Sequence, residues 1–281
     1  MKQIDVSVVS EAIKQMCIEA CVKLPADIKN LLDAALESET WEPAKKQLQN
    51  LILNYQYAER SNSPICQDTG ITCVFLEVGQ ELVFVGGSLE EAINKGVKEG
   101  YEDGCLRKSV VNDPLNRINT TTNTPALIYY DIVPGSSLKI TVAPKGFGCE
   151  NMSVIKMFKP TVGLQKIIEF IVGHIKEYAV NACPPLVIGV GIGGSFDKVA
   201  YIAKKAMLRP ADIPNSSPYY EKIEQELLLQ INDLGIGPAG FGGRTTALKV
   251  NVEALPTHIA GLPCAINVGC HAARYQQKII N

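Results

Sequence analysis

The sequence contains no apolar run that approaches the roughly 20 residues needed to cross a bilayer. Its charges nearly cancel, with 27 Lys and Arg against 29 Asp and Glu, so it gives no support for a nucleic-acid or anionic-membrane partner. The N-terminal segment MKQIDVSVVSEAIKQMC has acidic residues and helical periodicity where a signal peptide would have a basic start and an apolar block. We therefore expect a cytoplasmic protein.

The nine cysteines include no C-x-x-C pair, which argues against a zinc ribbon or a thioredoxin-type motif. A disulfide framework is typical of short secreted chains, and 281 residues is not short. Cys66, Cys149, Cys183 and Cys270 lie beside Gly, Pro or polar residues, where irregular backbone is expected. Three thiolates on Cys66, Cys183 and Cys270 could converge on one metal centre and leave a coordination position open for catalysis. Spacing alone does not separate this hypothesis from coincidence.

The pattern of apolar residues predicts a mixed α/β fold. Residues 5–60 repeat apolar side chains near i, i+3, i+4 and i+7, as amphipathic helices do. From residue 61 onward, strand-like and helical segments intermix without the strict β–α–β rhythm of a doubly wound fold. We predict one domain over residues 1–281, with a helical N-terminal layer over about 5–60 packed on a mixed sheet core over about 61–281. Predicted strands cover 72–79, 82–86, 126–133, 138–146, 246–255 and 262–269, and predicted helices 88–104, 162–180 and 218–233.

The run GVGIGGS satisfies G-x-G-x-x-G at Gly189, Gly191 and Gly194, between a predicted strand and a predicted helix. A dinucleotide-binding unit also requires a second strand that ends in Asp or Glu about 20 residues later. The segment LRPADIPNSSPYYEK at that place is broken by prolines. We therefore prefer a glycine turn that packs a helix against a strand. A nicotinamide-dependent oxidoreductase is the alternative, and it rests on this run alone.

Several basic residues lie beside glycine or asparagine turns, among them Arg107, Lys145 and Arg244. A guanidinium can pair with both oxygens of a carboxylate, and glycine-rich turns expose backbone N–H groups to anions. One such residue would usually be a solvated surface charge, but together they favour an anion site. Of the three histidines, His258 lies in a turn bounded by Pro and Gly and is the best candidate for acid–base chemistry. His271 follows Cys270 and could neighbour a metal.

Eight segments occur in order along nearly the whole chain: SPICQDTG, LRKSVVNDPLNR, NTTTNTPA, KGFGCENMS, VNACPPLVIGVGIGGS, LGIGPAGFGGRTTA, PTHIAG and INVGCHAARY. Together they resemble the class I, iron–sulfur fumarate hydratases, and specifically the alpha subunit of the two-subunit form. The resemblance implies a [4Fe–4S] cluster held by Cys66, Cys183 and Cys270, with one iron open to the substrate hydroxyl. Cys149 stands where the family more often has serine or alanine, so a ligand role is not carried over to it.

The resemblance also implies a substrate site. Substrate contacts fall on Gln67, Asp68, Arg107 and the backbone around Gly148, and proton transfer falls on Asp68 or His258. Neighbours of the site are Lys145, Asn151 and Arg244.

The implied reaction is the reversible hydration of fumarate to (S)-malate. It requires a separate beta subunit, in a hetero-oligomer expected to contain two alpha and two beta subunits. L-tartrate dehydratase shares the cluster and the two-subunit plan, and a mesaconate hydratase is a further alternative. The segments KGFGCEN and GGRTT favour the fumarase version. A non-catalytic scaffold of the same fold would lack at least one ligand cysteine, and all three are present here.

Overall fold

The computed structural model describes residues 2–281, which form two compact units. Unit 1 contains residues up to Pro25, together with 54–147 and 274–281, and unit 2 contains 26–53 and 148–273. Of the helices within residues 5–60, α1 (Val6–Val22) belongs to unit 1, α2 (Ala26–Ser38) to unit 2, and α3 (Glu42–Ser61) has residues in both.

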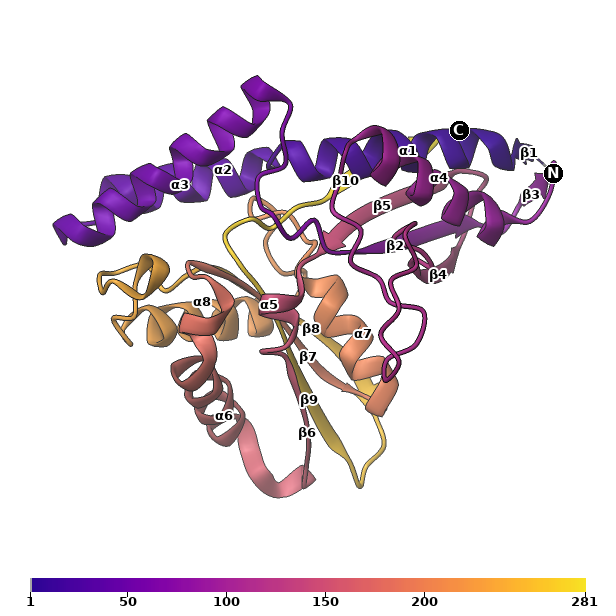
Figure 1. The fold of residues 1–281 in the computed structure, drawn as a ribbon. Helices are drawn as coiled ribbons and strands as arrows, with labels where there is room; N and C mark the ends of the chain where they lie inside the picture. Colours follow the sequence, from indigo (N-terminus) through magenta and orange to yellow (C-terminus); the bar gives the residue numbers. More distant parts are fainter. Residues whose placement is uncertain (1) are drawn as a thin grey trace. The chain divides into compact units, whose positions relative to one another are not determined.

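Unit 1 is built on a four-stranded sheet with the order β10-β5-β2-β4. β2 runs parallel to β4 and antiparallel to β5, and β5 is antiparallel to β10. Alternate residues of β2 and β5, such as Val74 and Ile140, share a core with Ile13 of α1 and Ile93 of α4. Figure 1 shows both helices beside this sheet. The strands are β2 (Ile71–Gly79), β4 (Leu127–Val133), β5 (Leu138–Lys145) and β10 (Gln276–Ile280), and α4 is Leu89–Asp103. A separate parallel pair joins β1 (Lys2–Asp5) to β3 (Leu82–Val85).

Unit 2 is built on a second sheet with the order β6-β9-β7-β8, in which β9 is antiparallel to the other three strands. α7 covers one face, while α6 and α8 cover the other (Figure 1). The elements are β6 (Val154–Phe158), β7 (Leu186–Gly194), β8 (Ala247–Thr257), β9 (Leu262–Gly269), α6 (Gly163–Tyr178), α7 (Phe196–Ala206) and α8 (Pro218–Asn232). Short helical turns complete the chain: α5 (Phe147–Glu150), η1 (Pro160–Val162), η2 (Ala179–Ala182) and η3 (Pro238–Gly240).

The glycine run lies inside a strand, so the predicted turn is misplaced. β7 continues through the run, and a Cβ added at Gly189 would lie 2.0 Å from the Ala203 carbonyl oxygen. At Gly191 it would lie 2.3 Å from the Val199 carbonyl oxygen. Both carbonyls belong to α7, so the glycines allow this helix to pack directly on the strand backbone. The predicted packing role of the run is confirmed.

The mixed α/β class predicted from the sequence is confirmed by the two mixed sheets and their covering helices. The long elements fall within a few residues of their predicted positions, and β9 coincides with the predicted strand 262–269. The short strands β1, β6 and β10 were not predicted. Across residues 2–281, every helix is too short or too polar to cross a membrane.

Candidate functional site

In unit 1, the predicted site residues gather at one end of the sheet. β2 begins at Ile71, directly after the loop of residues 66–70, and Ile71 pairs with Lys145 at the last position of β5. Strand direction therefore places the 66–70 loop beside Lys145. A Cβ added at Gly70 would lie 2.6 Å from the carbonyl carbon and oxygen of Lys145, and Gly70 has a φ of +77°. Only glycine combines this close approach with this backbone conformation.

Buried partners hold the 66–70 loop. The hydroxyl of Tyr101, which is fully buried, donates to the carbonyl oxygens of Thr69 at 2.7 Å and Gly70 at 3.1 Å. The buried Asn123 side chain donates to the Gly70 oxygen at 3.1 Å and accepts from the Ser109 N–H at 2.7 Å. The Thr69 hydroxyl donates to the Arg107 carbonyl oxygen at 2.7 Å. The backbone beneath Arg107 is therefore tied to the loop, although Arg107 is 38 residues away in sequence.

Asp68 is bonded through each of its polar groups. Its N–H donates to the Cys66 sulfur at 3.4 Å, and its carbonyl oxygen accepts from the Arg274 guanidinium at 2.8 Å. One carboxylate oxygen accepts from the Gly70 N–H and the other from the Phe147 N–H, each at 2.9 Å. The orientation of this predicted catalytic carboxylate is thus fixed by the surrounding backbone. Gln67 lies in the same loop, and its side chain is exposed.

In unit 2, the directions of the strands bring a second group of predicted residues to one sheet end. β6, β7 and β8 begin at this end and β9 finishes there. We call it the cysteine end, because Cys183 precedes β7 and Cys270 follows β9. The His271 ring nitrogen Nδ1 lies 3.2 Å from the Cys183 carbonyl oxygen, which confirms that the two segments meet. The other predicted residues at this end are Gly148 and Asn151, which precede β6, and Arg244, which precedes β8.

The segment that carries Arg244 is anchored within unit 2. The Arg244 N–H donates to the carboxylate of Glu39 at 2.8 Å, and Glu39 is only 3% exposed. The Ala239 N–H donates to the Pro184 carbonyl oxygen at 2.8 Å, so the glycine-rich segment before β8 packs beside the Cys183 loop. Arg244 itself is exposed, which leaves its guanidinium accessible to a solute.

The structure does not bring His258 to the cysteine end. His258 follows the last residue of β8, whereas Cys183 precedes the first residue of β7, and β7 and β8 are parallel. A strand the length of β8 spans about 30 Å. Within unit 2, His258 therefore lies at the opposite end of the sheet, where its Nδ1 accepts from the Ala260 N–H at 3.2 Å.

The three predicted ligand cysteines differ from most of the others in access to solvent. Cys66 and Cys270 are half-buried and Cys183 is exposed, as is Cys105, whereas the remaining five are buried: Cys17, Cys21, Cys73, Cys149 and Cys264. Burial raises the pKa of Cys264 to about 12 and that of Cys21 to about 11, which keeps both as thiols near neutral pH. Cys149 belongs to the unit 2 core instead.

Accessible thiols on irregular backbone fit the ligand set of an iron–sulfur cluster, and the N–H that points at the Cys66 sulfur fits a thiolate ligand. Cys66 belongs to unit 1, whereas Cys183 and Cys270 belong to unit 2. Within residues 2–281, no three or more His, Cys, Asp and Glu side chains are grouped so that they could hold a metal ion.

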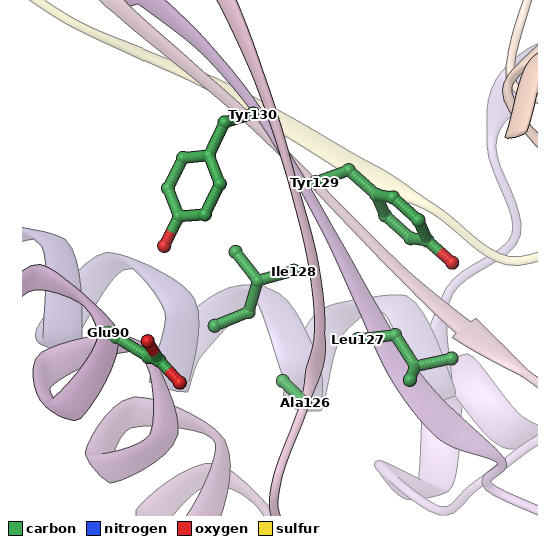
Figure 2. A pocket seen from close by; sticks show the side chains of 6 residues that line it. All are labelled: Glu90, Ala126, Leu127, Ile128, Tyr129 and Tyr130. Carbon is green, nitrogen blue, oxygen red and sulfur yellow. The ribbon is translucent and has the colours of Figure 1, made fainter. Parts of the chain in front are cut away.

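A pocket of about 310 Å³ in unit 1 contains none of the predicted site residues. Figure 2 shows that Ile128 and Tyr130 point to the side of Glu90, while Leu127 and Tyr129 point to the opposite side of β4. Burial, and secondarily the charge of Glu90, raises the pKa of Tyr130. The pocket is therefore a groove at β4, the edge strand of the sheet. Its lining residues are different from the predicted site residues that gather at the 66–70 loop.

The family model described as fumarate hydratase (Fumerase) matches residues 10–278. The chain belongs to the fumarate hydratase family.

This finding confirms the resemblance drawn from the eight sequence segments. A Methanocaldococcus jannaschii protein, provisionally named L(+)-tartrate dehydratase subunit alpha, is 39% identical over 282 residues, which cover 97% of each chain. The L(+)-tartrate dehydratase subunit alpha of Escherichia coli strain UTI89 is 31% identical over 277 residues, covering 97% of this chain and 91% of that protein. The names of the family and of these relatives indicate a hydro-lyase.

Sequence reasoning missed three of the residues that build the site: Tyr101, Asn123 and Arg274. Asn123 and Arg274 lie inside the segments NTTTNTPA and INVGCHAARY, so attention to every polar position of those segments could have found them. Tyr101 lies in a helix without any such signal. Its role follows only from the position of α4 behind the 66–70 loop.

Proposed function

We propose that this chain is the alpha subunit of an iron–sulfur hydro-lyase that reversibly hydrates fumarate to (S)-malate together with a separate beta subunit. The observation that carries the proposal is the gathering of the positions predicted from the family, His258 excepted, at one end of each sheet. In unit 1 these positions share a hydrogen-bonded framework around the 66–70 loop, and in unit 2 they lie at the cysteine end.

We assign the cluster ligands to Cys66, Cys183 and Cys270. A [4Fe–4S] cluster, when bound, supplies a Lewis acid for the oxygen that is added to or removed from the substrate. The fit rests on the access of the three thiols and on the N–H of Asp68 that points at the Cys66 sulfur.

The remaining chemistry falls to side chains of this chain. The substrate is a dicarboxylate, and the exposed Arg107 guanidinium can pair with both oxygens of one carboxylate. Lys145, Asn151 and Arg244 are proposed as further polar neighbours, with Gln67 and the Gly148 backbone as direct contacts.

Hydration requires a proton on one carbon and hydroxide on its neighbour. We assign the proton to the Asp68 carboxyl group. Each of its oxygens accepts one backbone N–H and keeps a further lone pair, so the group is oriented and can still exchange a proton. His258 remains the other proposed proton carrier, and within unit 2 it lies at the end of the sheet opposite the cysteine end.

Dehydration of L-tartrate is the second candidate, because both relatives described above carry that name. The segments KGFGCEN and GGRTT favour fumarate, and mesaconate is a further substrate of the same chemical class. We propose a cytoplasmic complex of two alpha and two beta subunits, in which the beta subunit supplies the remaining anion contacts.

The test is an anaerobic assay of the chain reconstituted with iron, sulfide and a beta subunit, using fumarate, malate, L-tartrate and mesaconate. We expect the highest kcat/KM with fumarate and malate, and a higher value with L-tartrate would assign the second candidate. Turnover of none of the four substrates would refute the proposal.

The ligand assignment is tested by Cys183→Ala, with Cys105→Ala as the control because Cys105 is also exposed. The first variant should lose both iron and activity, and the second should keep both. A full iron content in Cys183→Ala would remove Cys183 from the ligand set. Arg107→Ala should keep its iron but lose about 10²- to 10³-fold in kcat/KM, because the substrate carboxylate loses its charged partner. Arg117→Ala, in the same polar segment, should remain within about threefold of wild type.

A further inference from the structure

Arg274 is a buried charged residue that none of the assignments above uses. It lies two residues before β10 in unit 1 and is only 5% exposed. Arginine is rarely buried unless its charge is compensated and its N–H groups are bonded, because the desolvation cost is large. A buried arginine beside a proposed active site therefore requires a structural or functional reason.

The guanidinium of Arg274 lies against the 66–70 loop. Its Nη2 atom donates to the Asp68 carbonyl oxygen at 2.8 Å. A Cβ added at Gly146 would lie 3.2 Å from an Asp68 carboxylate oxygen and 3.8 Å from Arg274 Nη2, so the three groups are packed together. The positive charge also opposes the rise that burial causes in the pKa of Cys21, whose sulfur lies 3.9 Å from the Thr69 carbonyl oxygen. Arg274 thus lies behind the loop, on its buried side.

We propose that Arg274 is a positioning residue, whose guanidinium fixes the peptide group of Asp68 and thereby the directions of the Cys66, Gln67 and Asp68 side chains. Its role in turnover rests on the proposed function, whereas its role in ordering the loop does not.

The bonding of Asp68 gives the physical reason. The other three polar groups of Asp68 bond to the Cys66 sulfur and to the N–H groups of Gly70 and Phe147. The bond from Arg274 fixes the orientation of the peptide group between residues 68 and 69. Without this bond, rotation of the peptide group would change the directions of the Cys66, Gln67 and Asp68 side chains. A charge-assisted bond from a planar, buried guanidinium resists such rotation more strongly than a neutral bond. Small displacements of a reacting group cost large factors in rate, so this restraint should affect kcat.

The first test uses the chain without cluster or substrate. Hydrogen exchange of residues 66–70 and the alkylation rate of Cys66 are measured by mass spectrometry in wild type, Arg274→Ala and Arg209→Ala. Arg209 is the matched control, because it is a largely buried arginine that is paired with Glu224 and Glu253 in unit 2. Both variants should lose stability, but only Arg274→Ala should speed exchange and alkylation in the loop, by about 10-fold or more. An unchanged loop in Arg274→Ala would overturn the proposal whether or not the protein is active.

The second test uses the reconstituted enzyme. In Arg274→Ala, kcat should fall about 10- to 100-fold while KM changes less than about threefold, because substrate contacts remain and orientation is lost. Added guanidinium ion should restore part of kcat in this variant and not in Arg209→Ala. A loosened loop with wild-type kcat would refute the positioning role.

Arg274→Lys keeps the positive charge and N–H donors but loses the planar guanidinium, so it should lie between wild type and the alanine variant in both tests. If Arg274→Ala does not fold, the lysine variant tests the positioning role in its place. Wild-type behaviour of Arg274→Lys in both tests would then count against the proposal. If wild type turns over none of the four substrates, the proposed function fails, and the exchange measurement still decides whether Arg274 orders the loop.

Discussion

Replacement of Tyr101 by Phe removes one hydroxyl and leaves the packing of the fully buried ring unchanged. That hydroxyl donates to the carbonyl oxygens of Thr69 and Gly70, at the point where the 66–70 loop enters β2. Burial raises the pKa of Tyr101 well above its usual value, so the hydroxyl remains a donor over the whole range in which the protein is handled. The substitution therefore tests the contribution of this donor alone.

The size of the expected loss in stability follows from the hydrogen bonds that the two carbonyl groups keep. The Gly70 oxygen still accepts from Asn123 at 3.1 Å, whereas the Thr69 oxygen keeps only the weak Cys21 thiol at 3.9 Å. A buried carbonyl that loses its main donor costs about 1–3 kcal/mol, and one that retains a partner costs less. We expect Tyr101→Phe to lower the free energy of unfolding of unit 1 by about 1–2 kcal/mol.

The assay is urea unfolding, monitored through the hydrogen exchange of the β2 and β5 amides. A probe within unit 1 is needed because a chain with two units need not unfold in one transition. The midpoint should fall with no change in the slope, because the surface exposed on unfolding is the same. Tyr57→Phe is the control, as that side chain is 64% exposed and should change stability by less than about 0.5 kcal/mol. Equal midpoints for wild type and Tyr101→Phe would show that the 66–70 loop is held by other groups, which contradicts the reasoning.

Three further predictions concern unit 2. Gly189→Ala should destabilise it by about 3 kcal/mol or more in the same assay, because the new Cβ would lie 2.0 Å from the Ala203 carbonyl oxygen; a loss below about 1 kcal/mol would mean that α7 moves freely. Glu39→Gln should cost about 1–3 kcal/mol, since a carboxylate that accepts three backbone N–H groups, including that of Arg244, becomes an amide with one acceptor oxygen. Exchange of residues 241–246 should also speed up, and unchanged exchange would show that Glu39 does not anchor the segment. Burial raises the pKa of Cys264 to about 12, so the folded thiol stays protonated while the unfolded thiol ionises above about pH 8.5. The stability advantage of wild type over Cys264→Ala should thus be full below that pH and shrink by about 1.4 kcal/mol per unit as pH rises toward 12, whereas a pH-independent difference would contradict the burial argument.

The long elements could be predicted because their signal is local. α4, α8 and β9 have the apolar period of a helix or strand along their own length, and the structure places them within a few residues of the prediction. β1 and β6 span only four and five residues and exist as strands through their partners β3 and β9. No local pattern of that length distinguishes a strand from a loop, so they were missed.

At the glycine run, the tertiary structure corrects the turn that the local sequence predicted. The spacing of Gly189, Gly191 and Gly194 suggested a turn, because glycine is most often explained by its own backbone freedom. At Gly189 and Gly191 the backbone is instead part of a strand, and the missing side chains leave room for the carbonyl groups of α7, so the predicted packing of a helix on a strand holds without a turn at these two positions.

The sequence by itself determined the family, the fold class and the chemical types of the site residues, because side-chain chemistry and motif order are written along the chain. The tertiary structure decided which residues meet within each unit. Strand direction placed Cys183 and Cys270 at one end of a sheet and His258 at the other, although all three lie in motifs of the same family. Burial made Tyr101 and Arg274 the supports of the 66–70 loop. Proximity between residues distant in sequence depends on register and packing, which are properties of the whole fold.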